Sequence, residues 1–223
     1  MRLAVVQSPR VIRQIMALRA ALELDASLVV DELLLLRDLE GRSLRPLQPP
    51  PEVTPRFSAV LLLLYPSADE LWLPLTLRSA RLTTHRGEVS LPGGGCDPDD
   101  DGPVGTALRE AWEELGIVQE DVEVIGTLTA FYIPPSNNCL TPVVGLNRGT
   151  PHLRPDPNEV EAAFSVPLRM LLDPQTVHEE VWEYYGSKIR VPFFALEGYK
   201  VWGATALILS ELVARLRHVG LSA

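Results

Sequence analysis

Three glutamates lie close together near the middle of the chain, at Glu110, Glu113 and Glu114. If the segment is helical, their spacing of i, i+3 and i+4 places all three on one side of the helix. Like charges so close repel each other, and a divalent cation between them would remove that repulsion. Because oxygen ligands suit Mg²⁺ and Mn²⁺, the triplet indicates a metal site. The alternative interpretation is a solvated acidic face.

The same segment has an apolar side. At about 100° per residue, Glu113 and Glu114 fall within about 60° of Glu110, and apolar side chains gather opposite them. Gly116 provides a helix stop. We therefore expect a helix that presents carboxylates on one side and packs the other on a core. The side expected to pack consists of Val104, Leu108, Ala111, Trp112 and Leu115.

A glycine-rich segment, Leu91-Pro92-Gly93-Gly94-Gly95, precedes this helix and would let the main chain approach an anion or a metal closely. Together, segment and helix resemble the Nudix box of the Nudix hydrolases. The matching spacing is Gly95, five residues, Asp101, seven residues, Arg109-Glu110, then Glu113-Glu114 and Gly116-Ile117. The departure is Asp101, which stands where the box has a glutamate that usually contacts the box arginine.

The resemblance implies roles for these residues. Glu110, Glu113 and Glu114 would bind Mg²⁺ or Mn²⁺, together with the main-chain carbonyl of Gly94. Arg109 would pair with neighbouring carboxylates and hold them in place, so the expected catalytic residues are Arg109, Glu110 and Glu113.

The proton acceptor is left open by the motif. Glu110 or Glu113 would serve, and in several Nudix enzymes a glutamate from a distant loop does so instead. The candidates for that distant role are Glu159, Glu161 and Glu180.

A second motif, over residues 75–94, resembles the coenzyme A diphosphatase branch of the Nudix enzymes. The matching residues are Thr76, Arg78, Ser79, Gly87, Pro92, Gly93 and Gly94, whereas Pro74, Thr83 and Leu91 depart from the motif. Thr83 stands where the motif has its second arginine, and Arg81 or Arg86 would replace that arginine. The substrate-binding residues that this resemblance implies are Arg78, Ser79, Arg81, His85, Arg86 and Gly87.

The charge of this segment agrees with that substrate. Coenzyme A carries a diphosphate and a separate 3′-phosphate, so its site needs fixed positive charge beyond the metal. Arg78, Arg81, His85 and Arg86 concentrate potential cations in an otherwise acidic chain. The alternative is a solvated basic loop that balances the acidic helix.

Composition limits the possible partners. The formal net charge of −9 and the lack of a basic arm argue against nucleic acid. Cys96 and Cys139 offer neither a disulfide framework nor zinc-ligand spacing, so we expect a reducing, cytoplasmic compartment. No run of apolar residues reaches transmembrane length and no signal peptide is evident, so we expect no membrane association.

The pattern of elements predicts the α/β class, and the resemblance implies a Nudix-type α/β/α sandwich with a mixed β-sheet. We expect a partly helical N-terminal extension over residues 1–51 and a Nudix domain over residues 52–223, with a possible homodimer. The expected helices cover residues 12–24, 166–172 and 204–219, another helix follows the loop of the box and stops at Gly116, and residues 28–36 are helix or strand. The expected strands cover residues 56–64, 70–77, 122–132, 140–146, 181–185 and 188–194.

The function that the sequence favours is metal-dependent hydrolysis of coenzyme A or its derivatives to 3′,5′-ADP and 4′-phosphopantetheine. One alternative keeps the chemistry and takes ADP-ribose or a dinucleotide as substrate. Another is a Nudix module that senses a nucleotide without cleaving it, although such a module has no need of a complete carboxylate set.

Overall fold

The computed structural model describes residues 8–44, 46–79, 87–184 and 186–223. Its central strand is β1 (Arg56–Ser67), which pairs in parallel with β7 (Asn138–Asn147) and antiparallel with β2 (Glu70–Arg78). Both parallel and antiparallel pairs therefore occur in one mixed, eight-stranded sheet. The other strands of this sheet are β3 (Val89–Ser90), β4 (Gly93–Gly95), β5 (Val122–Thr127), β6 (Phe131–Ile133) and β8 (Val160–Pro167).

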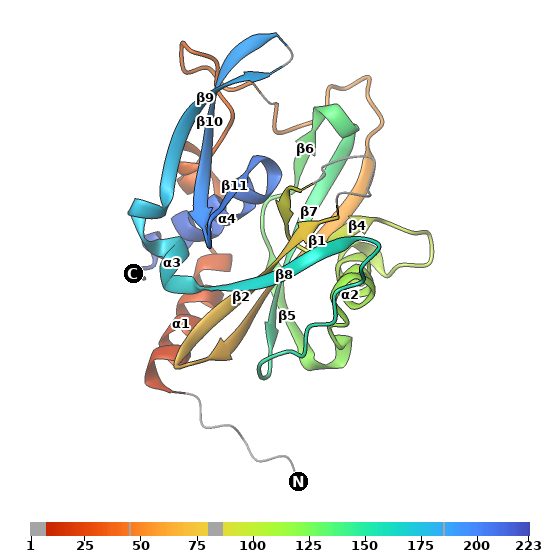
Figure 1. Cartoon of the computed structure of the whole chain (residues 1–223), viewed down its shortest axis with the longest axis vertical. Helices are drawn as coiled ribbons and strands as arrows, with labels where there is room; N and C mark the ends of the chain where they lie inside the picture. The colour runs from red at the N-terminus through yellow and green to blue at the C-terminus, as the bar shows by residue number, and fades with distance from the viewer. Residues whose placement is uncertain (1–7, 45, 80–86, 185) are drawn as a thin grey trace.

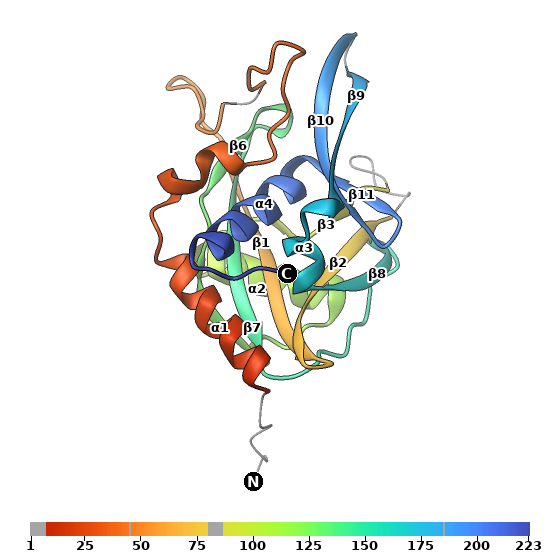
Figure 2. The ribbon, with the colours of Figure 1, turned by 90° about the vertical axis from the view of Figure 1, so that its left-hand side faces the viewer.

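Helices cover both faces of the sheet (Figures 1 and 2). Helix α2 (Gly102–Leu115) packs on one face, and helices α1 (Pro9–Leu22) and α4 (Gly203–His218) lie on the other. The alternation of side chains along β1 explains how one strand serves two cores. Leu61 and Leu63 pack with α2, whereas Leu62 and Leu64 belong to the cluster that includes α1 and α4. The expected α/β/α sandwich with a mixed sheet is confirmed.

A second sheet projects at one end of the molecule (Figure 1). It contains β9 (Val177–Tyr184), β10 (Ser187–Leu196) and β11 (Tyr199–Trp202) in the order β11-β10-β9. The hairpin expected at residues 181–194 is therefore present, and β11 adds a third strand to it. Short helices connect the larger elements: η1 (Ala26–Glu32), η2 (Gln119–Asp121), η3 (Pro134–Ser136), α3 (Leu168–Leu172) and η4 (Pro174–Thr176).

Two expected elements were placed wrongly. The strand expected over residues 122–132 is broken into β5 and β6, because Thr129 turns out of the sheet to donate from its N and Oγ1 to the buried Glu211 of α4. Residues 160–167, for which no strand was expected, form β8 along β2, and α3 begins only at Leu168. Pro167 separates them, since proline ends a strand readily and suits the start of a helix.

The N-terminal helix is part of the main core. Ser8 accepts a hydrogen bond from the Val11 N and caps α1. Val11, Leu18 and Ala21 are buried in the same cluster as the leucines of β1 and β2. The division of the chain between residues 51 and 52 stays a prediction.

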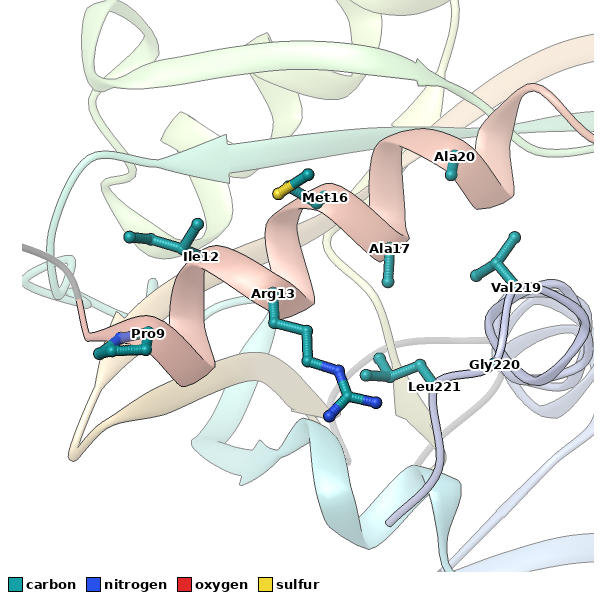
Figure 3. Close-up of a pocket in the computed structure, with 9 residues that line it drawn as sticks. All are labelled: Pro9, Ile12, Arg13, Met16, Ala17, Ala20, Val219, Gly220 and Leu221. Atoms are coloured by element: carbon teal, nitrogen blue, oxygen red, sulfur yellow. The ribbon is translucent and has the colours of Figure 1, made fainter.

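An open groove runs between α1 and the residues that follow α4 (Figure 3). Its α1 side carries the exposed side chains of Ile12, Arg13 and Met16, and its other side carries Val219 and Leu221. Across the described residues, no helix is long and apolar enough to span a membrane.

Candidate active site

Arg109 lies at the centre of the acidic cluster on α2. Its Nη1 donates to Oε1 of Glu110 at 2.9 Å and to Oε2 of Glu113 at 3.0 Å. Its Nη2 donates to the carbonyl of Gly95 at 3.0 Å, which ties the helix to the glycine-rich strand β4. One guanidinium therefore fixes two of the three carboxylates and their distance from β4.

The acidic partner of Arg109 from the preceding loop is Asp100. Nε and Nη2 of Arg109 donate to its two oxygens at 2.9 and 3.0 Å. Asp100 also accepts from Oγ1 of Thr106 and from the main-chain N of Asp97. Arg109 and these donors hold the pKa of Asp100 well below its usual range, and Asp100 in turn raises the pKa of Arg109.

Asp101, at the position of the box glutamate, is the residue at the N-cap of α2 and makes no side-chain capping bond there. The sequence could not distinguish these neighbours, because Asp99, Asp100 and Asp101 are consecutive. The run of aspartates was the available signal for Asp100. Asp100 lies one residue before the aligned position, and its side chain, although shorter than that of a glutamate, still reaches Arg109.

Glu114 is the buried member of the triplet, with 2% of its surface exposed. It lies seven residues after Ala107 and three after Ala111, both of which pack on β1, so it faces the sheet rather than solvent. Burial raises the pKa of Glu114 to about 8, although Arg78 opposes that effect. The prediction of which side of α2 packs was therefore partly wrong. Trp112 follows Ala111 by one position and points outward, where it is 57% exposed.

Glu110 lies directly against Gly94. A Cβ on Gly94 would overlap the Glu110 carboxylate, so only glycine leaves room for it. Burial raises the pKa of Glu110, and Arg109 partly offsets the increase. The predicted ligands Glu110 and Gly94 are thus adjacent in space, although 16 positions separate them in the sequence.

The donor set fits a hard divalent cation. Oε2 of Glu114 is buried and has no hydrogen-bond partner among the described residues, and burial also raises the pKa of Glu110. A cation would satisfy that oxygen and offset the repulsion among the carboxylates. In the described residues, however, no group of three or more His, Cys, Asp or Glu side chains is arranged to hold a metal ion. Arg109 accounts for the absence of such a group, because its guanidinium bonds the carboxylates of Glu110 and Glu113 and draws them toward itself.

The predicted substrate-binding segment is only partly described. Nη1 of Arg78 lies 3.9 Å from Oε1 of Glu114, so this arginine borders the acidic cluster. Ser79 is buried and its main-chain N donates to the carbonyl of Glu159, while the N of Gly87 donates to the carbonyl of Arg78. Arg81, His85 and Arg86 lie outside the described residues.

One of the three distant glutamates influences the acidic cluster electrostatically. The negative charge of Glu159 contributes to the raised pKa of both Glu110 and Glu114. Glu161 is exposed on β8, and Glu180 pairs with Lys200 in the smaller sheet. The carbonyl of Glu159 accepts from the main-chain N of Ser79, so Glu159 lies next to Arg78, whose guanidinium borders Glu114.

Comparison with known proteins agrees with this architecture. The NUDIX domain family matches residues 55–185, which is more than half of the chain. The chain therefore belongs to the Nudix hydrolase family, as the box predicted.

Three relatives within the family are similar to this chain. It is 40% identical over 177 residues to Nudix hydrolase 15, mitochondrial, from Arabidopsis thaliana, a match that covers 75% of this chain and 61% of the relative. It is 41% identical over 138 residues to the human mitochondrial coenzyme A diphosphatase NUDT8, covering 60% of this chain and 58% of the relative. A Photorhabdus laumondii protein called uncharacterized Nudix hydrolase NudL is 36% identical over 189 residues, covering 82% and 98%. The chain thus spans about three fifths of the plant and human proteins and nearly all of the bacterial one.

Proposed function

We propose that this protein is a metal-dependent Nudix hydrolase that cleaves the diphosphate of coenzyme A or its derivatives into 3′,5′-ADP and 4′-phosphopantetheine. The observation that carries the proposal is the set of carboxylates on α2, with Glu110 against Gly94, the buried Glu114 bordered by Arg78, and Arg109 bonded to Glu110 and Glu113. The name of the human relative and the motif over residues 75–94 support coenzyme A as the substrate.

The chain's own residues have distinct tasks in this proposal. Glu110, Glu113, Glu114 and the Gly94 carbonyl would hold Mg²⁺ or Mn²⁺, which neutralises diphosphate oxygens and acidifies water when bound. Arg109 and Asp100 keep the carboxylates in position, and Arg78 supplies positive charge to the diphosphate. Glu159, which comes from outside the box, would accept a proton from the attacking water in this proposal.

A screen in Mg²⁺ or Mn²⁺ tests the substrate, with products identified by mass. The substrates are coenzyme A, acetyl-coenzyme A, dephospho-coenzyme A, ADP-ribose and NADH. We expect 3′,5′-ADP from coenzyme A and much weaker binding of the dephospho form, since that form lacks the 3′-phosphate. Equal kinetics for coenzyme A and its dephospho form would contradict the phosphate argument and favour a broader dinucleotide pyrophosphatase.

Glu114→Gln tests the metal. It keeps the shape of the side chain and removes its charge, so we expect turnover in Mg²⁺ to fall at least about 100-fold while the fold is retained. Glu120→Gln, on the exposed turn η2, is the matched control. Unchanged turnover in Glu114→Gln would remove this residue from the ligand set.

The remaining expectations about the molecule's surroundings stay proposals. They are a cytoplasmic location, a homodimer and the absence of nucleic-acid partners.

A further inference from the structure

Phe57 is an exposed aromatic residue at the end of the sheet nearest the acidic cluster. Its side chain is 62% exposed, although Ser58 and Ala59, the next residues of β1, are buried. Along β1, Ala59, Leu61 and Leu63 point to the side that α2 covers. Since side chains two residues apart share a face, Phe57 continues that row, and α2 does not cover it.

The neighbours of Phe57 on both sides are the two cysteines of the chain. Cys139 on β7 is its register partner, and the main-chain N of Cys96, directly after β4, donates to the Phe57 carbonyl at 2.9 Å. Cys96, Phe57 and Cys139 therefore form one row across three adjacent strands, and both thiols are partly exposed. This row, which we call the Phe57 row, carries no charge.

The Phe57 row lies beside the carboxylates. The next row along the sheet pairs Ala59 with Gly94, against which the Glu110 carboxylate lies. Two residues of a strand span about 6.6 Å, so the two rows are separated by about that distance on one face. β1, β4 and β7 lie side by side next to α2 in Figure 1.

We propose that the Phe57 row is the platform on which the substrate's nucleobase stacks. This inference rests on the proposed function, because it takes the diphosphate to lie at the carboxylates. In a nucleotide, one ribose separates the diphosphate from the base, which is comparable to the separation of the two rows. An uncharged, exposed phenyl ring offers no attraction to a phosphate and a good surface to a flat heterocycle.

Steady-state kinetics test the stacking. Phe57→Ala is expected to raise KM about tenfold for the nucleotide that the wild type hydrolyses best, with little change in kcat, because a stacked base binds without taking part in the reaction. Phe57→Tyr keeps the ring and should restore the wild-type KM. Val181→Ala truncates a similarly exposed residue on the smaller sheet and is the control. An unchanged KM in Phe57→Ala would overturn the inference.

The two thiols provide a readout that does not depend on turnover. In the wild-type protein with Mg²⁺, alkylation of Cys96 and Cys139 by N-ethylmaleimide is followed by peptide mass spectrometry. We expect 3′,5′-ADP to slow alkylation of both, and inorganic pyrophosphate, which has no base, to protect much less. Equal protection by the two ligands, or none by 3′,5′-ADP, would contradict a base on this row.

The outcomes separate the two proposals. If the wild type hydrolyses ADP-ribose and not coenzyme A, the substrate proposal fails, and Phe57→Ala is then measured with ADP-ribose. If the wild type hydrolyses coenzyme A and neither KM nor alkylation responds as expected, the Phe57 inference fails and the proposed function stands.

Discussion

At the scale of single residues, the acidic cluster depends on which carboxylate Arg109 contacts. Asp100 provides both oxygens, and Glu110 and Glu113 share the remaining Nη1. A bidentate arginine–carboxylate pair fixes both distance and orientation, so Asp100 acts on the reaction through Arg109.

Asp100→Asn tests that role. We expect kcat/KM to fall by about 10- to 100-fold, because residues that orient metal-binding side chains typically contribute that much. Asp101→Asn makes the same change one residue later and should remain close to wild type. A larger loss in Asp101→Asn than in Asp100→Asn would show that the aligned box position matters more than the observed contact.

The lowered pKa of Asp100 also predicts how stability depends on pH, which a comparison of wild type with Asp100→Asn measures. The pKa of Asp100 is lowered on folding, so its contribution to stability is present above the usual carboxyl pKa and is lost as pH falls through the lowered value. Denaturant unfolding should therefore show a wild-type advantage over Asp100→Asn that is constant near neutral pH and shrinks only below about pH 4. An advantage that grew on acidification would contradict the ionised pair.

Glu159 is the second residue for which we propose a role in the reaction. Glu159→Gln is expected to lower kcat by about 10²- to 10⁴-fold, which is the usual contribution of a general base, with less effect on KM. Glu161→Gln removes a carboxylate two residues away on the exposed side of β8 and is the control. Equal losses in the two variants would indicate a general effect of charge.

At the scale of elements, the site is formed where β4 meets α2. Arg109 contacts the Gly95 carbonyl and Glu110 lies against Gly94, so three glycines in a row permit a helix to approach a strand closely. The small residues Ala107 and Ala111 on the sheet-facing side of α2 permit the same approach to β1. The bulky Trp112 is consequently left in solvent.

Gly94→Ala tests this approach. The added methyl group would displace the Glu110 carboxylate, so we expect metal affinity, measured by Mn²⁺ titration calorimetry, to fall by about 10- to 100-fold. Gly95→Ala adds the same methyl group where nothing lies within 4 Å and keeps the carbonyl that Arg109 contacts. Similar affinities in the two variants would mean that the fit between Gly94 and Glu110 has no part in metal binding.

At the scale of the whole molecule, a buried ion pair joins the two ends of the chain. Nε of Arg215 on α4 donates to Glu211 at 2.9 Å, and its Nη1 donates to the carbonyl of Leu24, just after α1, at 2.8 Å. Glu211 also accepts from Thr129 in the break between β5 and β6. This pair of charges therefore links α4 to the residues that follow α1 and to the main sheet, in addition to the apolar contacts among these elements.

Arg215→Ala should destabilise the protein by about 3–5 kcal/mol, because it leaves Glu211 charged, buried and without its partner. Arg13→Ala, on the exposed groove of α1 in Figure 3, should change stability by no more than about 0.5 kcal/mol. Urea unfolding measures both. A small effect of Arg215→Ala would show that α1 is held by its apolar contacts alone.

The sequence by itself determined what depends on local spacing. The positions of Glu110, Glu113 and Glu114 and the end of the helix at Gly116 follow from periodicity and from the conformational freedom of glycine. The central strands were equally evident, since long apolar runs between turn residues can be recognised without knowledge of their partners.

Only the tertiary structure decided which distant groups meet. It selected Asp100 over Asp101, buried Glu114 beside Arg78, and left Phe57 exposed between Cys96 and Cys139. Each of these results depends on strand register or on the approach of a helix to a sheet. Such contacts join residues far apart in the chain, and a shift of one residue in register would turn every side chain of a strand to the opposite face.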